Sequence, residues 1–272
     1  MTSIVIRKRT ALSTPEWKTV PFAKVPKTSK DMIFDIMSDV SGIFEDFDRA
    51  ATLETQAERQ EQYLRVVGEC WNVDCSLTWW YENIAPKKAI TALIERNFED
   101  TTPEDVAVAY IMSHYWTACV LLYSTLRLTL AACSATDALL CLPERADPRI
   151  YCKHIIDATE VLHHQLAGAF GAHAQVFPLG MAAAYLLATE GGLDGCSERS
   201  PATDKMFSFF DKGASGARLK GLLSSMFRST GVPVPGDDGK RNEIEQMALQ
   251  ARAWFGMDKG EGLEAIVRRL LW

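Results

Sequence analysis

Residues 102–132, TPEDVAVAYIMSHYWTACVLLYSTLRLTLAA, form the stretch that decides the fold. Thr102 is a good N-cap, and Pro103 follows at the first helical position, where its missing amide hydrogen costs nothing. From about 106 to 132 this is the most apolar segment of the chain. The pattern predicts one central helix, buried by the rest of the protein.

Helix signals continue on both sides of this segment. Upstream, Thr28-Ser29-Lys30-Asp31 offers a capping box ahead of apolar residues at helical spacing, and a second helix is predicted over about 53–81. No run of alternating strand residues and no solenoid repeat is present. The predicted class is all-α, an irregular multi-helix bundle around the helix at about 106–132. Further helices are predicted over about 148–165, 175–190, 203–212, 217–227, 241–255 and 263–271.

Composition shifts predict four regions. Residues 1–27 contain three prolines and no sustained period, which favours an extended arm. Residues 28–228 then form the helical domain. The Gly-, Pro- and Asp-rich stretch at 229–240 indicates a flexible linker, and 241–272 forms a helical tail.

The charge and the cysteines exclude several classes of protein. A formal net charge of -6, with Arg7-Lys8-Arg9 as the one basic run, argues against a broad phosphate-binding face. No Cys-x-x-Cys occurs, so we expect no structural zinc site. We also expect no other metal and no cofactor. The seven cysteines are interpreted as reduced core residues: Cys70, Cys75, Cys119, Cys133, Cys141, Cys152 and Cys196.

The amino terminus does not have the pattern of a secretory signal, because its charges follow a very short apolar run. The apolar stretch 106–130 raises the question of a membrane span, but it contains His114 and Arg127, which are costly in lipid. We therefore expect no membrane partner and an intracellular location, in the nucleus or the cytoplasm.

Several short segments, in one order, carry a resemblance to a known family. They are Pro15-Glu16-Trp17-Lys18-Thr19-Val20-Pro21-Phe22, Asp35 to Ile43, Asp48-Arg49, Cys70-Trp71-Asn72-Val73-Asp74, Trp80-Tyr81, His114-Tyr115-Trp116, Leu121-Leu122-Tyr123, Leu126-Arg127, Phe177 to Met181 and Tyr185-Leu186. Together, over most of 15–228, they resemble the carboxy-terminal regulatory region of fungal binuclear zinc-cluster transcription factors.

The resemblance implies a helical regulatory-type domain over 28–228 for effector sensing, autoinhibition or coregulator docking. The family's six-cysteine zinc cluster is absent from these 272 residues, so we expect no autonomous DNA binding from them. The expected function is a transcription-factor-like regulatory protein linked to fungal secondary metabolism. Its expected partner is a transcription factor or a coregulator. That the chain is part of a longer factor stays open.

Polar residues gather on one arc of the central helix. The arc holds Tyr110, Ser113, His114, Thr117, Ser124 and Arg127, with Trp116 and Tyr123 nearby. Buried unpaired charge is costly, so Arg127 and His114 need partners. One interpretation is a structural ion pair, to Asp35, Asp39 or Asp48. The other is the polar wall of a pocket for an apolar small molecule, with Tyr110, His114, Trp116, Thr117, Tyr123 and Arg127 as ligand-binding residues.

A second polar cluster lies at Asp157, Glu160, His163 and His164. Glu160-x-x-His163 copies half of a di-iron ligand set, but a di-iron bundle needs two such motifs and no second one exists. A solvated helix face with local pairs is the simpler interpretation.

An enzyme is the competing hypothesis, either a biosynthetic enzyme or a small-molecule binder of a fungal natural-product pathway. If the chain is an enzyme, its catalytic residues are Glu160, His163, His164 and Arg127. A magnesium triad at Asp74, Thr78 and Glu82 is a weaker alternative, because Glu45-Asp46-Phe47-Asp48 has the wrong spacing for the second motif. No Gly-x-Ser-x-Gly, P-loop or dinucleotide fingerprint is present.

Overall fold

The computed structural model describes residues 2–86, 98–133, 135–190, 200–210, 213–228 and 243–257. All regular structure in these residues is helical, which confirms the predicted all-α class. The α-helices are α1 (Thr2–Val5), α2 (Pro15–Thr19), α3 (Ser29–Thr52), α4 (Gln56–Asn83), α6 (Pro103–Ala132), α7 (Thr136–Leu140), α8 (Pro148–Leu162), α9 (Gly168–Ala174), α10 (Val176–Glu190), α11 (Pro201–Phe210), α12 (Gly213–Arg228) and α13 (Glu243–Phe255). Short 3-10 helices are η1 (Ala11–Ser13), η2 (Val20–Phe22), η3 (Phe98–Asp100), η4 (Glu144–Ala146) and η5 (Gln165–Ala167).

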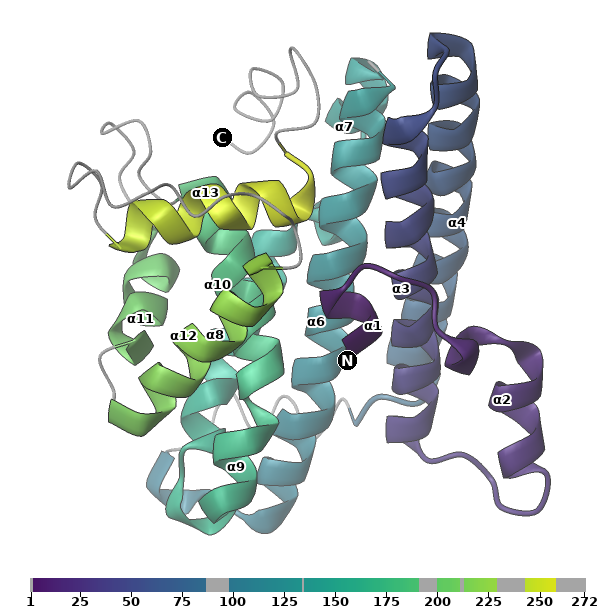
Figure 1. Ribbon diagram of the computed structural model, residues 1–272. Helices are drawn as coiled ribbons and strands as arrows, with labels where there is room; N and C mark the ends of the chain where they lie inside the picture. The colour runs from purple at the N-terminus through teal and green to yellow at the C-terminus, as the bar shows by residue number, and fades with distance from the viewer. Residues whose placement is uncertain are drawn as a thin grey trace.

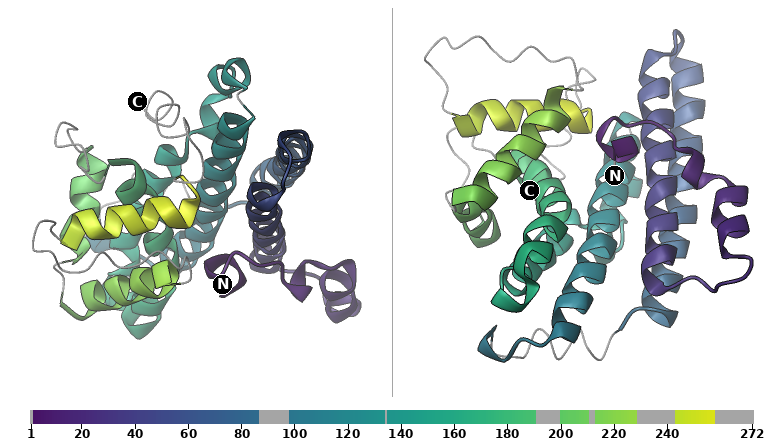
Figure 2. Two further views of the ribbon diagram at one scale, coloured as in Figure 1. Left: turned by 45° about the horizontal axis from the view of Figure 1, so that its top comes forward. Right: turned by 60° about the horizontal axis from the view of Figure 1, so that its bottom comes forward.

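The long helix α6 is the centre of the molecule. Figures 1 and 2 show α3 and α4 as an antiparallel pair on one side of α6, and α8 to α13 on the other. Helix α6 is long and apolar enough to cross a membrane, but 83% of that stretch is buried inside the protein. Such burial accounts for its composition, because each large apolar side chain removed from water contributes about 1.5–3 kcal/mol.

The helix starts predicted from sequence are present with their hydrogen bonds. Thr28 and Asp31 make both bonds of a capping box at α3, and Thr102 and Asp105 do the same at α6, with Pro103 in the first turn. Each such cap contributes about 1 kcal/mol. These caps fix where the two helices begin.

The amino-terminal arm differs from the predicted extended segment. Residues 2–22 contain α1, η1, α2 and η2; α1 and η1 contact α3, and α2 stands to one side of it (Figure 1). The Arg7 guanidinium binds the Asp48 carboxylate through two hydrogen bonds of 2.8 and 3.0 Å. It also lies over the rings of Phe44, at 4.5 Å, and Trp254, at 5.4 Å. The arm folds onto the helices because the contacts of Arg7 with Asp48, Phe44 and Trp254 replace the contacts with water that Arg7 would make in an extended arm.

The last helix among the described residues, α13, belongs to the core. Trp254 is buried, and its indole N–H donates to the Val5 carbonyl at 3.0 Å. Helix α13 crosses over α10 (Figure 1), where the Phe255 ring meets Tyr185 edge-on at 5.8 Å. The predicted linker at 229–240 and the predicted helix at 263–271 lie outside the described residues.

Of the cysteines, Cys70, Cys119, Cys133 and Cys152 are buried, as predicted, whereas Cys75 and Cys141 are exposed. All six are free thiols; Cys196 lies outside the described residues.

Candidate functional site

The hydroxyls of the predicted arc on α6 bond back to their own helix. Ser113 donates to the Ala109 carbonyl at 2.5 Å, and Thr117 donates to Ser113 at 2.6 Å. Ser124 donates to the Leu121 carbonyl at 3.0 Å. These side chains are buried, and each hydroxyl donates its hydrogen to a carbonyl of α6.

His114 and Tyr110 form an aromatic contact at one end of α6. His114 is buried against Phe34, with ring centroids 4.9 Å apart, and its Nδ1 lies 2.8 Å from the Tyr110 carbonyl oxygen. Burial lowers the pKa of His114 to about 4, so the ring is neutral near pH 7. Tyr110 also meets the Phe170 ring of α9 edge-on at 5.1 Å. Both residues therefore have packing roles.

Arg127 has a different partner from those predicted. Its guanidinium donates to the Ala146 carbonyl at 3.1 Å and lies near Asp147. Burial alone would raise the pKa of Asp147, but the hydrogen bonds from Arg149 and the charge of Arg127 outweigh it and lower that pKa. The predicted partners bind other cations: Asp35 pairs with Lys27, Asp39 with Lys18, and Asp48 with Arg7. The predicted ion pairs of Arg127 to α3 are therefore wrong. Its partners come from the η4–α8 turn because the carboxylates of α3 face the arm.

Trp116 and Tyr123 point to separate neighbours. The Trp116 indole stacks on His154 of α8, with centroids 5.1 Å apart. The Tyr123 hydroxyl donates to Oδ1 of Asp74 at 2.6 Å. Neither residue lines either of the two cavities described below.

The predicted catalytic cluster is divided among three environments. Glu160 and Asp157 share Lys205 of α11, at 3.0 and 2.9 Å. His163 lies 3.0 Å from the Gln175 amide nitrogen and stacks on Phe209, at 5.6 Å between centroids. His164 Nδ1 accepts from the Leu166 N–H at 3.3 Å, as a cap of η5. No group of three or more metal-ligating side chains occurs in the described part of the chain.

A polar network centred on the buried Asp74, missed by sequence reasoning, lies between α4, α6 and η4. Arg145 reaches the Asp74 carboxylate through Nε at 3.2 Å and through a terminal nitrogen at 2.9 Å. Tyr151 donates to the Arg145 carbonyl at 2.8 Å, and its ring stacks on Tyr123 at 5.7 Å. One signal was available: Asp74 lies between Cys70 and Leu77 on the apolar stripe of α4, so it had to be buried. With Asp74 so used, Asp74, Thr78 and Glu82 do not form a free magnesium triad.

The single basic run is neutralised by α3. Arg7 pairs with Asp48, Lys8 with Glu45 at 3.3 Å, and Arg9 with Asp46 at 2.5 Å. The acidic stretch from Glu45 to Asp48, considered for magnesium, thus binds the arm. This pairing leaves little free positive charge for phosphate binding.

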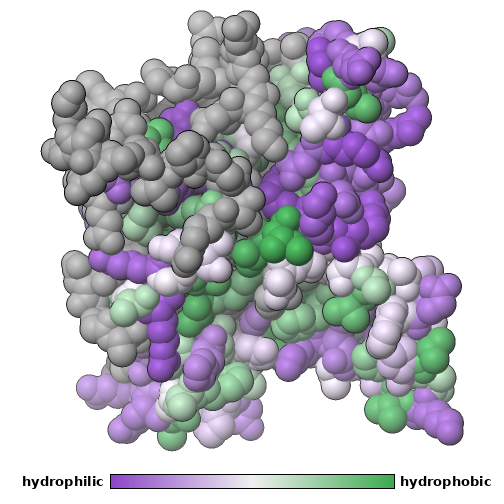
Figure 3. Space-filling view, in the orientation of Figure 1, coloured by the Kyte–Doolittle hydropathy of each residue, from purple (hydrophilic) through white to green (hydrophobic). Residues whose placement is uncertain are grey.

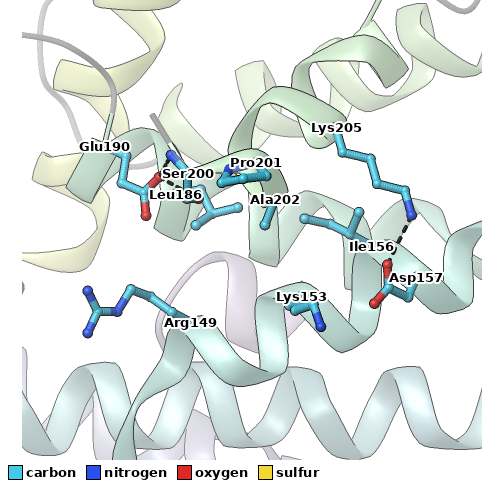
Figure 4. A pocket seen from close by; sticks show the side chains of 10 residues that line it. All are labelled: Arg149, Lys153, Ile156, Asp157, Leu186, Glu190, Ser200, Pro201, Ala202 and Lys205. Atoms are coloured by element: carbon cyan, nitrogen blue, oxygen red, sulfur yellow. Dashed lines mark hydrogen bonds and ion pairs between the residues drawn. The ribbon is translucent and has the colours of Figure 1, made fainter. Parts of the chain in front are cut away.

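A pocket of about 500 Å³ opens between α8, the end of α10 and the start of α11. Figure 4 shows Arg149 and Glu190 at one end, Lys205 with Asp157 at the other, and Ile156, Leu186 and Ala202 between them. Glu190 is tied to the start of α11, because its Oε2 accepts from the Ser200 N–H at 3.1 Å, the Ser200 hydroxyl at 2.9 Å and the Thr203 hydroxyl.

A groove of about 320 Å³ runs between the arm and α3. Its apolar lining includes Leu12, Trp17, Phe22, Phe34 and Met37. Figure 3 shows hydrophobic side chains at the surface over the α2 region, at the lower right. Four large apolar residues of the arm are more than half exposed: Leu12, Trp17, Val20 and Val25.

The chain matches no known protein family, no curated protein and no solved structure.

Proposed function

We propose that this protein is a transcription-factor-like regulatory protein that acts through protein contacts in the control of fungal secondary metabolism. Its partner in this proposal is a transcription factor or a coregulator. The collinear segments that resemble the regulatory region support the proposal, and the helical bundle accords with it. The DNA-binding function belongs to that partner, because the acidic chain and its neutralised basic run do not favour binding to phosphates.

The exposed apolar surface of the arm is the observation that carries the proposal. Trp17 is 54% exposed and lines the groove beside α3, with Leu12 and Val20 more exposed still. Large apolar side chains clustered on one short segment are typical of interaction sites, and tryptophan is enriched among residues that dominate binding energy.

The groove fits an amphipathic helix of the partner. Its walls come from two elements, the arm and α3, so an inserted apolar side chain would contact both. Recognition of this kind uses two or three apolar anchors at helical spacing. The arm is held in place by the pairs of Lys18 with Asp39 and of Lys27 with Asp35, which keep the groove formed.

A matched pair of tryptophans tests the proposal. A photo-crosslinking amino acid is placed in cells at Trp17 or at Trp79, which is 53% exposed on α4. We expect crosslinks to a transcription factor or coregulator from position 17 and far fewer from position 79. With the purified partner, Trp17→Ala should weaken binding by at least about tenfold, whereas Trp79→Ala should leave it unchanged. Equal crosslinking from both positions, or crosslinks to no transcriptional regulator, would refute the proposal.

The geometry lends the enzyme hypothesis no comparable support. Glu160, His163 and His164 have separate partners, and Arg127 is bound to the η4–α8 turn. Deleting the gene separates the two classes, since loss of a regulator changes transcript levels, whereas loss of an enzyme changes one product and leaves transcripts unchanged.

A further inference from the structure

The pocket between α8, α10 and α11 has an apolar middle. Ile156 and Leu186 are buried and form its floor, and Pro201 and Ala202 cover it from α11. Its volume of about 500 Å³ falls within the range of sites that enclose small organic molecules. An apolar ligand body would replace the water that now contacts this lining.

The two acids of the pocket already have partners. Asp157 receives the Lys205 ammonium at 2.9 Å, and Lys205 also reaches Glu160. One oxygen of Glu190 accepts three hydrogen bonds from Ser200 and Thr203. Neither carboxylate therefore needs a cation from a ligand.

Two of the three cations in the lining are paired with carboxylates. Lys205 pairs with Asp157 and Glu160. Arg149 binds Asp147 at 2.8 Å, but Lys153 is exposed and makes no hydrogen bond or ion pair with the described residues. Lys153 lies on α8 between the two charged ends (Figure 4). An anionic group beside Lys153 would be stabilised, and a cationic group would be repelled.

We propose that this pocket is a binding site for a small organic acid, with an elongated apolar body over Ile156 and Leu186 and one carboxylate beside Lys153. The site is separate from the arm groove, so it goes beyond the proposed docking function and does not depend on it. Because Lys153 is exposed to solvent, its attraction for the ligand carboxylate is screened by salt, so the affinity for the acid should fall as the salt concentration increases.

The binding test uses three probes with the same apolar chain: decanoate, decanol and decylamine. Each displaces anilinonaphthalene sulfonate, a fluorescent apolar anion, from the folded protein. Decanoate should bind at least about tenfold more tightly than decylamine, with decanol between them. Decylamine binding as tightly as decanoate would overturn the proposal, and so would failure of decanoate to displace the dye. This comparison needs no variant.

Three variants then place the site. Lys153→Glu should weaken the binding of decanoate by about tenfold and leave the binding of decanol unchanged, since only the carboxylate of decanoate contacts Lys153. Ala202→Trp should abolish binding of both probes by filling the pocket. Lys24→Glu, which reverses an exposed lysine on the arm, serves as the control and should bind as the unaltered protein does. Unchanged decanoate affinity in both Lys153→Glu and Ala202→Trp, with native circular dichroism, would show that the acid binds elsewhere and would refute the site.

Discussion

Tyr123 and Asp74 are joined by a 2.6 Å hydrogen bond between α6 and α4, although 49 residues separate them. The carboxylate is buried and also receives the Arg145 guanidinium, so one acidic side chain ties three elements together. Asp74 and Tyr123 are shielded from water, so leaving either of them without its partner is costly.

Tyr123→Phe should therefore lower the free energy of unfolding by about 1–3 kcal/mol. Tyr185→Phe is the matched control, since Tyr185 is as deeply buried but its hydroxyl has no hydrogen-bond partner among the described residues. Removing that hydroxyl should leave stability unchanged or raise it. Urea denaturation of the two variants measures both effects, and equal losses would show that the Asp74 contact contributes nothing specific.

His114 should make stability depend on pH. Burial lowers its folded-state pKa to about 4 from the ordinary 6.5, so below pH 6.5 the unfolded chain binds more protons than the folded one. Stability then falls as the pH falls toward 4. Protonation of this residue in the unfolded chain should lower the free energy of unfolding by about 2 kcal/mol between about pH 7.5 and pH 5.

The measurement is urea denaturation at both pH values. His114→Gln should shrink the drop by that amount, whereas His173→Gln, which alters an exposed histidine of α9, should retain it. An unchanged drop in His114→Gln would mean that His114 is not buried as a neutral ring.

Arg7 should stabilise the protein far more than its neighbour Lys8. Arg7 is buried between Phe44 and Trp254 and makes two hydrogen bonds to Asp48, so Arg7→Ala should cost about 3 kcal/mol. Lys8 pairs with Glu45 at the surface, and Lys8→Ala should cost less than about 1 kcal/mol. Thermal unfolding of both variants provides the comparison. Similar losses would contradict the role of Arg7 in tying the arm to α13.

Two glycines should respond in opposite directions to alanine. A Cβ at Gly68, inside α4, meets no atom within 4 Å, so Gly68→Ala should stabilise the protein by about 0.5–1 kcal/mol. A Cβ at Gly171 of α9 would lie 1.9 Å from the Leu162 carbonyl oxygen, so Gly171→Ala should cost about 1–3 kcal/mol. Calorimetric melting temperatures distinguish these outcomes, and a stabilised Gly171→Ala would contradict the close approach of α9 to α8.

The helices were predictable because their signals are local. Thr102 and Pro103 mark the start of α6, and Asp147 with Pro148 marks the start of α8, in both the sequence and the structure. Helix α4 begins at Gln56, three residues after the predicted start near Leu53, because Thr55 and Glu58 form a capping box there. Local rules therefore suffice for the long helices of this fold, but not for the short helices α1 and α2 of the arm.

The polar contacts were not predictable, because their partners lie far apart in sequence. Asp74 meets Arg145 across 71 residues, and no local pattern favours this pair over other acids and bases. The arm shows the same limit. Its prolines favoured an extended chain, but the pairing of Arg7 with Asp48 folds it onto α3. The pocket of α8, α10 and α11 likewise depends on the packing of three helices.

The most direct test of the proposed regulatory function compares transcripts in cells that carry Trp17→Ala, Trp79→Ala or a deletion of the gene. The account predicts that the deletion changes a set of transcripts of a biosynthetic pathway, that Trp17→Ala reproduces the change at normal protein abundance, and that Trp79→Ala matches the unaltered protein. A deletion that removes one metabolite while leaving every transcript unchanged, or a Trp17→Ala profile equal to that of the unaltered protein, would contradict it.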